Sequence, residues 1–535
     1  MNKTLSNFIL FAFISLVLAN CANRGNPDGG PKDEKPPVIV DESPKNFSTN
    51  FKGNIIKIYF DEYVKIKDLQ KQLIISPPLK IQPEITPLGS ASKYITIKIF
   101  DTLQPNTTYA FNFGNSIVDN NEGNPYPYYR YVFSTGSYID SLSVKGVIVD
   151  ALKRIPDTFV NVGLYEVDST FTDSIVYKQT PKYITNTLDS VTTFSIENIK
   201  AGKYMLMALK DGNGDNKFQQ KSDQIGFYKS FISVPTDSSY TLKLFKEDLN
   251  FNAIRPKLVA GEKIAFGYEG DYKEMRIELK SEAPQDFKYR ITKDEKADTL
   301  YYWYKPKLEV DSLIFKVSGT NFNKDFTVRI KDQKKDTLTV KSFPLASINE
   351  PFLIRGSVPF TNFDVSKVTL TDKDSLKIDF TTDFDSINNT YALNFKKTED
   401  NNYKIEILPE AFTDFFDKKN KDTLSFRAST KKASDFGYVR FRLNNATYPL
   451  IFQLVDDKGT VKYEQYATKP EPLDFLNLNS GKYFVRVIHD ANSNGKYDTG
   501  NYLKKIQPER VSHFEMSEDV RADWGLEQTL NFTTD

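Results

Sequence analysis

Residues 94–109, Tyr-Ile-Thr-Ile-Lys-Ile-Phe-Asp-Thr-Leu-Gln-Pro-Asn-Thr-Thr-Tyr, decide the fold. In the first half, apolar and polar side chains alternate with a period of two and β-branched and aromatic residues dominate, which is typical of a half-buried strand. The second half is a turn rich in Asp, Pro and Asn. Short runs of this kind continue from Val38 onward, and only residues 63–69 suggest a helical turn. The sequence therefore predicts an all-β chain of serial β-sandwiches.

The composition bounds the class of protein. A length of 535 residues predicts four or five domains. Because the chain has 71 Lys and Arg against 70 Asp and Glu, its net charge of +1 gives no electrostatic footprint for nucleic acid, which would need a basic domain or stripe. A single cysteine rules out an intrachain disulfide and a cysteine zinc cage. The composition therefore favours a folded, multidomain, non-enzymatic protein that does not bind nucleic acid.

The N-terminus reads as a lipoprotein leader. Lys3 precedes an apolar run at residues 8–18 that is too short to cross a bilayer. The run ends in Leu-Ala-Asn-Cys21, which resembles a lipobox, although Asn20 departs from the usual small residue. We therefore expect residues 1–20 to be a signal peptide, Cys21 to be lipidated, and the Gly-, Pro- and charge-rich residues 21–36 to form a flexible tether.

The first domain is expected at residues 37–137. Leu103-Gln-Pro-Asn-Thr-Thr-Tyr109 resembles a tyrosine corner, in which a phenol ties a connection to upstream backbone. Together with Pro36-Pro37, Phe60-Asp-Glu62 and residues 119–124, this pattern resembles the bacterial Ig-like domain of S-layer proteins. That resemblance implies a fold and not an activity.

The second domain, expected at residues 138–250, contains an internal repeat. A glycine turn followed by a strand at residues 202–208 resembles transthyretin-like or carboxypeptidase-regulatory-like sandwiches. A shift of 279 residues pairs this segment with a second one near the C-terminus, and the matched pairs include Asn198 and Asn477, Gly202 and Gly481, Tyr204 and Tyr483, Asp211 and Asp490, and Asn213 and Asn492. The shared register predicts a second transthyretin-like sandwich at residues 433–535.

Two further β-rich blocks, at residues 251–348 and 349–432, are expected to be Ig-like sandwiches. In the second of them, residues 414–426 resemble the end of the first domain. The whole arrangement resembles a group of outer-membrane lipoproteins of Bacteroidota. The resemblance rests on the tether at residues 29–33, the Ig-like domain and the closing run at residues 490–524. It implies a lipid-anchored outer-membrane protein whose partners are β-barrels or other envelope proteins, and it implies no enzymatic activity. The face of the membrane stays open.

The repeated Asp loops have the spacing of a calcium loop, with oxygen ligands at positions 1, 3, 5, 7 and 9. The acid at position 12 is missing, although Asp223 stands one residue beyond it in the first loop. The alternative is a tight hairpin whose side chains bond their own backbone. The calcium candidates are Asp211, Asn213, Asp215, Lys217, Gln219 and Asp223 in the first loop, and Asp490, Asn492, Asn494 and Asp498 in the second.

A second recurrence is Asp-Ser/Thr followed by an aliphatic residue. One interpretation is a turn that leads into a strand. The other is an O-glycosylation sequon, which the triplet resembles. The candidate hydroxyls are Thr102, Ser141, Ser174, Ser190, Thr299, Ser312, Thr337, Ser375, Ser386 and Thr423.

The loop aromatics Tyr126, Tyr128 and Tyr129 are candidates for ligand binding, whereas core packing is the favoured interpretation of residues 301–304.

No nucleophile elbow or phosphate-binding loop is present in the sequence. The leading hypothesis is a non-enzymatic, lipid-anchored interaction or scaffold protein of the outer membrane, such as an accessory subunit of a β-barrel complex for barrel assembly or transport. The alternative is a surface carbohydrate-binding or adhesion protein.

Overall fold

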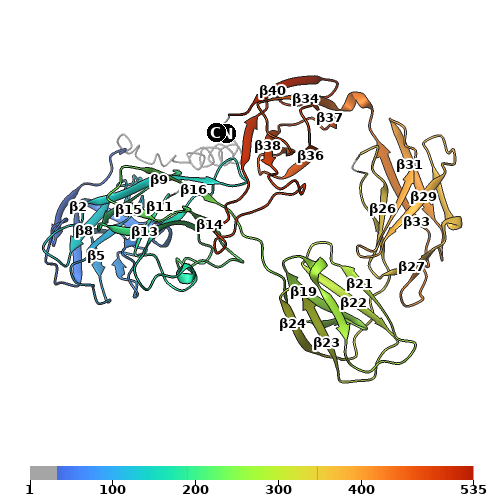
Figure 1. Cartoon of the computed structure of the whole chain (residues 1–535), viewed down its shortest axis with the longest axis horizontal. Coiled ribbons are helices and arrows are strands. Elements are labelled where there is room, and N and C mark those ends of the chain that lie inside the picture. The colour runs from blue at the N-terminus through green and yellow to red at the C-terminus, as the bar shows by residue number, and fades with distance from the viewer. Residues whose placement is uncertain (1–32, 189–190, 346, 534–535) are drawn as a thin grey trace, which may run out of the picture.

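The computed structural model describes residues 33–188, 191–345 and 347–533, and these residues are almost entirely β-structure (Figure 1). They form serial sandwiches of mostly antiparallel sheets, which confirms the predicted fold class. The expected signal peptide and Cys21 lie outside the described residues, as does most of the expected tether. In the part of the chain that is described, no helix is long and apolar enough to cross a membrane.

The first sandwich has two sheets and one short helix. One sheet has the order β1 (Ile39–Ser43), β2 (Ile55–Ile66), β5 (Ser92–Lys98) and β4 (Glu84–Thr86), with β7 (Ile117–Asp119) also on β2; the other has the order β3 (Ile74–Ser76), β6 (Thr108–Asn112) and β8 (Arg130–Ser134). The helix α2 is Leu69–Gln72. The helical turn expected at residues 63–69 was therefore misplaced, because residues 64–66 pair with β7 as the end of a long strand.

The predicted tyrosine corner is confirmed. The backbone N–H of Gln104 donates a hydrogen bond of 2.9 Å to the phenol oxygen of buried Tyr109. The fourth sandwich repeats this contact, because the N–H of Thr398 donates to the phenol oxygen of Tyr403 at 2.7 Å. The same device thus fixes a connection before a core strand in both sandwiches.

Among its described residues, the second sandwich contains eight strands and a short 3-10 helix, η1 (Asp173–Tyr177). Its sheets have the orders β11-β10-β13-β14, with β15 also on β13, and β12-β9-β16. The strands are β9 (Leu142–Asp150), β10 (Asn161–Glu166), β11 (Tyr183–Asn186), β12 (Thr193–Ile199), β13 (Gly202–Lys210), β14 (Gln224–Phe227), β15 (Ile232–Val234) and β16 (Ser239–Leu244).

The fifth sandwich has the matching sheet orders β36-β35-β38-β39 and β37-β34-β40. Its strands are β34 (Gly437–Asn444), β35 (Leu450–Val455), β36 (Val461–Ala467), β37 (Leu473–Leu478), β38 (Phe484–His489), β39 (Val511–Glu515) and β40 (Gly525–Asn531), and the 3-10 helix η4 (Ala433–Asp435) precedes them.

The internal repeat predicted from the 279-residue register is confirmed by this topology. In both sandwiches the last strand pairs in parallel with the first, β16 with β9 and β40 with β34. The matched tyrosines also make the same contact. The phenol of Tyr204 donates to the carbonyl oxygen of Lys200 at 3.0 Å, and that of Tyr483 to the carbonyl oxygen of Asn479 at 2.8 Å.

The third sandwich has sheets of order β17-β19-β22-β21, with β18 on β19, and β20-β23-β24. Its elements are β17 (Asn252–Ala253), β18 (Lys257–Ala260), β19 (Lys263–Glu269), η2 (Tyr272–Glu274), β20 (Arg276–Leu279), β21 (Lys288–Lys293), β22 (Thr299–Lys305), β23 (Ser312–Gly319) and β24 (Phe322–Arg329).

The fourth sandwich has sheets of order β25-β26-β30-β29, β27-β32 and β28-β31-β33. Its elements are β25 (Val340–Ser342), β26 (Phe352–Gly356), β27 (Phe360–Phe363), η3 (Val365–Lys367), β28 (Val368–Thr371), β29 (Phe380–Asp385), β30 (Thr390–Phe395), β31 (Asn401–Ile407), β32 (Phe412–Asp414) and β33 (Leu424–Thr430). Because β25 pairs with β26, this sandwich begins before the boundary expected between residues 348 and 349.

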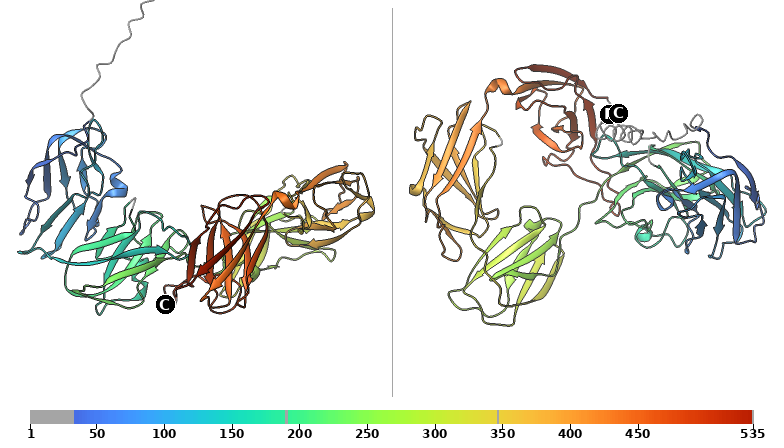
Figure 2. Two further views of the ribbon diagram at one scale, coloured as in Figure 1. Left: turned by 90° about the horizontal axis from the view of Figure 1, so that it is seen from above. Right: turned by 180° about the vertical axis from the view of Figure 1, so that it is seen from behind.

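The second to fifth sandwiches form a closed circuit. In Figure 1 they follow one another around a central opening, and the fifth returns to the second, as the right-hand view of Figure 2 also shows. The first sandwich lies outside this circuit against the second, where the N–H of Ile184 donates to the hydroxyl of Ser76 at 3.1 Å. The contact that closes the circuit involves the repeated Asp loops.

Candidate functional site

Each Asp loop contributes one aromatic residue to the apolar cluster where the second and fifth sandwiches touch. Phe218 lies in the first loop and Tyr497 in the second, and the 279-residue shift pairs these two residues. Both belong to one apolar cluster on the second sandwich, in which Phe218 is buried and Tyr497 is partly buried. Equivalent residues of the repeat therefore pack into one shared contact.

In each loop one carboxylate joins the start of the loop to its end by accepting hydrogen bonds from two backbone N–H groups. In the first loop, Asp223 accepts hydrogen bonds from the N–H groups of Gly212 and Gln219 at 3.0 and 2.7 Å. In the second loop, Glu509 accepts from the equivalent N–H groups of Ala491 and Asp498 at 2.9 and 3.0 Å.

Asp498 and Glu509 are seven residues further apart in sequence than Gln219 and Asp223. The fifth sandwich therefore carries an insertion at this point of the repeat. We call residues 499–508 the arm.

The arm places Tyr502 inside the second sandwich. This side chain is 0% exposed and belongs to the apolar cluster there. Its phenol donates to the sulfur of Met205 at 3.0 Å, and its ring meets Phe227 edge-on at 5.4 Å. Its backbone N–H donates to the carboxylate of Glu247, whose pKa is raised by burial.

Polar contacts hold the rest of the arm. The Thr499 hydroxyl donates to the carbonyl oxygen of Lys246 at 2.6 Å, and the Gln507 amide donates to that of Phe227 at 2.9 Å. The Lys505 ammonium lies 2.6 Å from the Asp173 carboxylate and 4.0 Å from the centre of the Tyr502 ring. The arm is thus fixed along its length.

Beside the arm, three basic side chains occupy the same interface. Arg486 of β38 is 5% exposed, and its guanidinium donates to Gln453 at 2.6 Å and to the Leu152 carbonyl oxygen of the second sandwich at 3.3 Å. Arg154 of the second sandwich pairs with Glu515 of β39 at 2.9 Å. Burial, aided by the positive charges of Arg486 and Arg154, lowers the pKa of His513 to about 4.

Within the first Asp loop, side chains bond to the backbone. Asp211 accepts from the N–H groups of Asn213, Gly214 and Asn216 at 3.0, 2.8 and 2.6 Å. The Asp215 carboxylate accepts from the amide of Gln219 at 2.9 Å. These are the contacts of the hairpin interpretation.

The second Asp loop is built likewise. Burial would raise the pKa of Asp490, yet hydrogen bonds from Gly495, Tyr466 and Asn494 outweigh it and hold this pKa below its usual value. The amides of Asn492 and Asn494 both donate to Asp498. Within the described residues, no group of three or more His, Cys, Asp or Glu is arranged to hold a metal. Calcium binding stays a prediction.

The Asp-Ser/Thr triplets occupy several settings. Some lead into a strand, because Thr299 and Ser312 begin β22 and β23. Ser174 lies in η1, and Ser174 and Thr299 are half-buried, while Ser190 lies outside the described residues. The other hydroxyl residues are exposed, namely Thr102, Ser141, Ser312, Thr337, Ser375, Ser386 and Thr423.

The candidate ligand aromatics differ in exposure. Tyr128 is 50% exposed and Tyr126 is half-buried. Tyr129 is only 6% exposed, and its phenol donates to Glu42. The expectation that Tyr129 is available to a ligand was therefore wrong, because its ring packs edge-on against Tyr126 and closes the core of the first sandwich. Tyr302 and Tyr304 are buried in the core of the third sandwich, as expected, whereas Trp303 is buried in a separate cluster with residues of the fourth sandwich.

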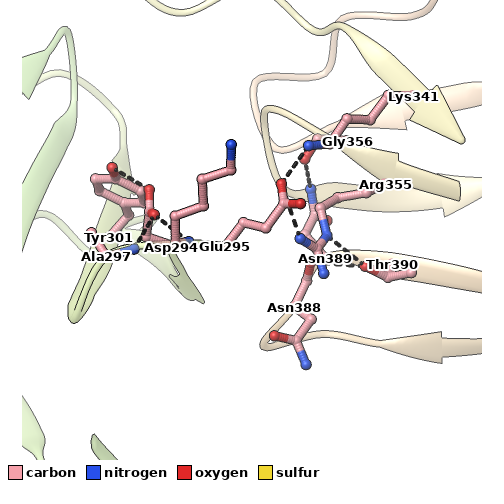
Figure 3. Close-up of polar contacts among 11 residues, drawn as sticks. Asp294, Glu295, Ala297, Tyr301, Lys341, Arg355, Gly356, Asn388, Asn389 and Thr390 are labelled. Carbon is pink, nitrogen blue, oxygen red and sulfur yellow. Dashed lines mark hydrogen bonds and ion pairs between the residues drawn. The ribbon is translucent and has the colours of Figure 1, made fainter. Parts of the chain in front are cut away.

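A second joint links the third and fourth sandwiches (Figure 3). Glu295, in the turn between β21 and β22, pairs with Lys341 and lies 3.4 Å from Arg355, both on the fourth sandwich. Beside this contact, Trp303 of the third sandwich packs with Val358 and Phe415 of the fourth. The joint therefore combines ion pairs with apolar contact.

Comparison with known proteins adds one assignment. Residues 33–135 match the family described as Bacterial Ig-like domain. The first sandwich is a bacterial Ig-like domain. No curated protein matches the sequence significantly.

Among solved structures the chain is similar to domains 1–6 of the surface layer protein SbsC, with 12% identity over 90% of this chain and 67% of that one and a TM-score of 0.14. It is also similar to the Bacillus anthracis TIE protein, with 12% identity over 99% of this chain and 79% of that one and a TM-score of 0.15. Such low scores carry no argument about function.

Sequence reasoning missed the arm and the joint residues, including Tyr502, Arg486 and Glu295. The arm had a signal in the sequence, because the spacing after the second Asp loop breaks the 279-residue register. No comparable signal marks Glu295, whose partners come from another sandwich.

Proposed function

We propose that the protein is a non-enzymatic scaffold, anchored by a lipid on Cys21 in the outer membrane, that holds other envelope proteins. The observation that carries the proposal is the closed circuit of sandwiches, in which the arm and the Glu295 joint fix neighbours by buried and ion-paired side chains. A frame of this kind presents loops of several sandwiches as one constant surface, and loops on a rigid support are common binding sites.

The partner proposed is a β-barrel protein of the outer membrane, which this chain would accompany as an accessory subunit for barrel assembly or transport. The serial β-sandwiches, of which the first is a bacterial Ig-like domain, support a structural role for the protein. No nucleic-acid partner is proposed, because the net charge is only +1.

The test is purification of the protein at native expression from membranes in a mild detergent, after crosslinking in cells. We expect a barrel protein to purify with it in a fixed ratio. Cys21→Ala is the control, and it should release the protein from the membrane and abolish the association. A solitary monomer in both preparations would contradict the proposal. Protease shaving of intact cells assigns the face of the membrane.

A surface carbohydrate-binding or adhesion role is the second candidate, and the exposure of Tyr128 beside half-buried Tyr126 favours it. Exposed tyrosine rings pack against apolar faces of ligands. On this hypothesis a glycan array gives a signal that Tyr128→Ala removes. An array without signal, or binding unchanged in Tyr128→Ala, rejects this candidate.

A further inference from the structure

A basic groove lies on the third sandwich, between β18 and β24. Its volume is about 290 Å³. Arg255 and Lys257 line it from one side, and Arg329 and Lys331 from the other. We refer to these four residues and the space between them as the basic groove.

The four cations of the groove are exposed and lack acidic partners. In the described part of the chain, no carboxylate lines the groove or lies within 4.0 Å of any of the four charged groups. Nearby lysines differ in this respect, because Lys307 pairs with Asp332 at 2.6 Å and Lys335 pairs with Glu262 at 3.0 Å. Since the chain as a whole has a net charge of only +1, the excess is a local feature.

Like charges gathered in one groove repel one another, and the repulsion is relieved by a bound anion. The remaining polar lining, Thr327 and Gln333, can donate further hydrogen bonds. Arginine forks match phosphate oxygens in pairs, while lysine supplies a compact charge. Phosphate also concentrates more charge in one group than a carboxylate does, which suits four cations around one small space.

We propose that the basic groove binds a ligand with two or more adjacent phosphate groups. The volume is near the lower end for small-molecule sites, roughly 300 Å³, and is suited to a small polyphosphate or to the headgroup of a multiply phosphorylated lipid. The inference is independent of the barrel partner, because the groove is far from the arm in the sequence and uses different residues.

The experiment is a calorimetric titration of the purified chain without its expected leader, residues 33–535, with tripolyphosphate at low ionic strength. We expect saturable binding to one site, weakened by added salt as for other charge-dominated complexes. The variant Arg329→Gln/Lys331→Gln should bind at least tenfold more weakly. The control, Lys288→Gln/Arg290→Gln on exposed positions of β21, removes the same charge from the same sandwich and should bind as the unaltered chain does. An unchanged melting temperature in both variants checks folding.

Vesicle co-sedimentation distinguishes the two sources of phosphate. Binding to phosphatidylcholine vesicles that contain cardiolipin, lost in the groove variant, assigns a lipid headgroup; tripolyphosphate binding without co-sedimentation assigns a soluble ligand. Three results overturn the proposal. They are absence of saturable tripolyphosphate binding, equal loss in both double variants, and equally tight binding of polyglutamate.

Discussion

Tyr109 shows how a single side chain can fix a connection in this chain. Its phenol oxygen accepts the N–H of Gln104, so removing the hydroxyl leaves that donor without its partner. We expect Tyr109→Phe to lower the free energy of unfolding of the first sandwich by about 1–2 kcal/mol. Tyr128→Phe is the matched control, because its ring is half exposed, and it should have no effect. Calorimetric melting of both variants measures the difference, and equal melting curves would contradict the assigned role.

His513 gives the interface a dependence on pH. Its pKa is about 4 in the folded chain, against 6.5 in a free histidine, because burial and two arginines disfavour its protonated form. Above pH 6.5 the histidine is neutral in both the folded and the unfolded chain, so it does not change the free energy of unfolding. As the pH falls from 6.5 towards 4, the unfolded chain takes up the proton more readily, and the folded chain loses up to about 3 kcal/mol of stability.

Urea denaturation of the unaltered chain and of His513→Gln at pH 7.5 and 4.5 tests this. The unaltered chain should lose more stability between these pH values than the variant does. Parallel losses would show that the histidine is not responsible.

For the Asp loops the sequence left two interpretations open, a calcium site and a tight hairpin. Because Asp211 and Asp490 already accept backbone hydrogen bonds, we expect the hairpin interpretation to hold. Calcium and a chelator should then leave the melting temperature unchanged. Stabilisation by calcium that disappears in Asp215→Asn would instead establish a calcium site in the first loop.

Among the elements, the strands and the repeat were predictable, whereas the arm was not. Alternation in residues 94–100 is a local pattern, and the 279-residue register compares the sequence of one sandwich with that of another, so both can be read from the sequence alone. Tyr502 is part of a loop whose binding surface lies more than 250 residues earlier in the chain. Its apolar character predicts burial, but a pattern within the fifth sandwich does not identify the other sandwich as its partner.

The arm can be tested as an element, because the first repeat shows how the loop closes without it. Tyr502→Ala removes a fully buried aromatic ring and should weaken the contact between the second and fifth sandwiches by about 3 kcal/mol. Limited proteolysis should then cut the arm faster than in the unaltered chain. Lys504→Ala, an exposed arm position, is the control. Equal cleavage rates in all three proteins would contradict a fixed arm.

At the scale of the whole molecule, the sequence predicted serial sandwiches but not their closure into a circuit. Serial sandwiches predict an extended rod, and this prediction was wrong, because contacts between distant segments bring the fifth sandwich back to the second. The pairing of Arg154 with Glu515 and the insertion of Tyr502 are such contacts, and the Glu295 joint fixes two consecutive sandwiches within the circuit. The scaffold proposal depends on this closure, because a rod with free joints would not hold its loops in constant positions.

Small-angle X-ray scattering of the soluble chain, residues 33–535, tests the closed circuit most directly. The account predicts that the scattering of the unaltered chain matches the compact circuit of Figure 1, and that Tyr502→Ala increases the radius of gyration and the maximum dimension. An unaltered chain that is already as extended as Tyr502→Ala would contradict the account.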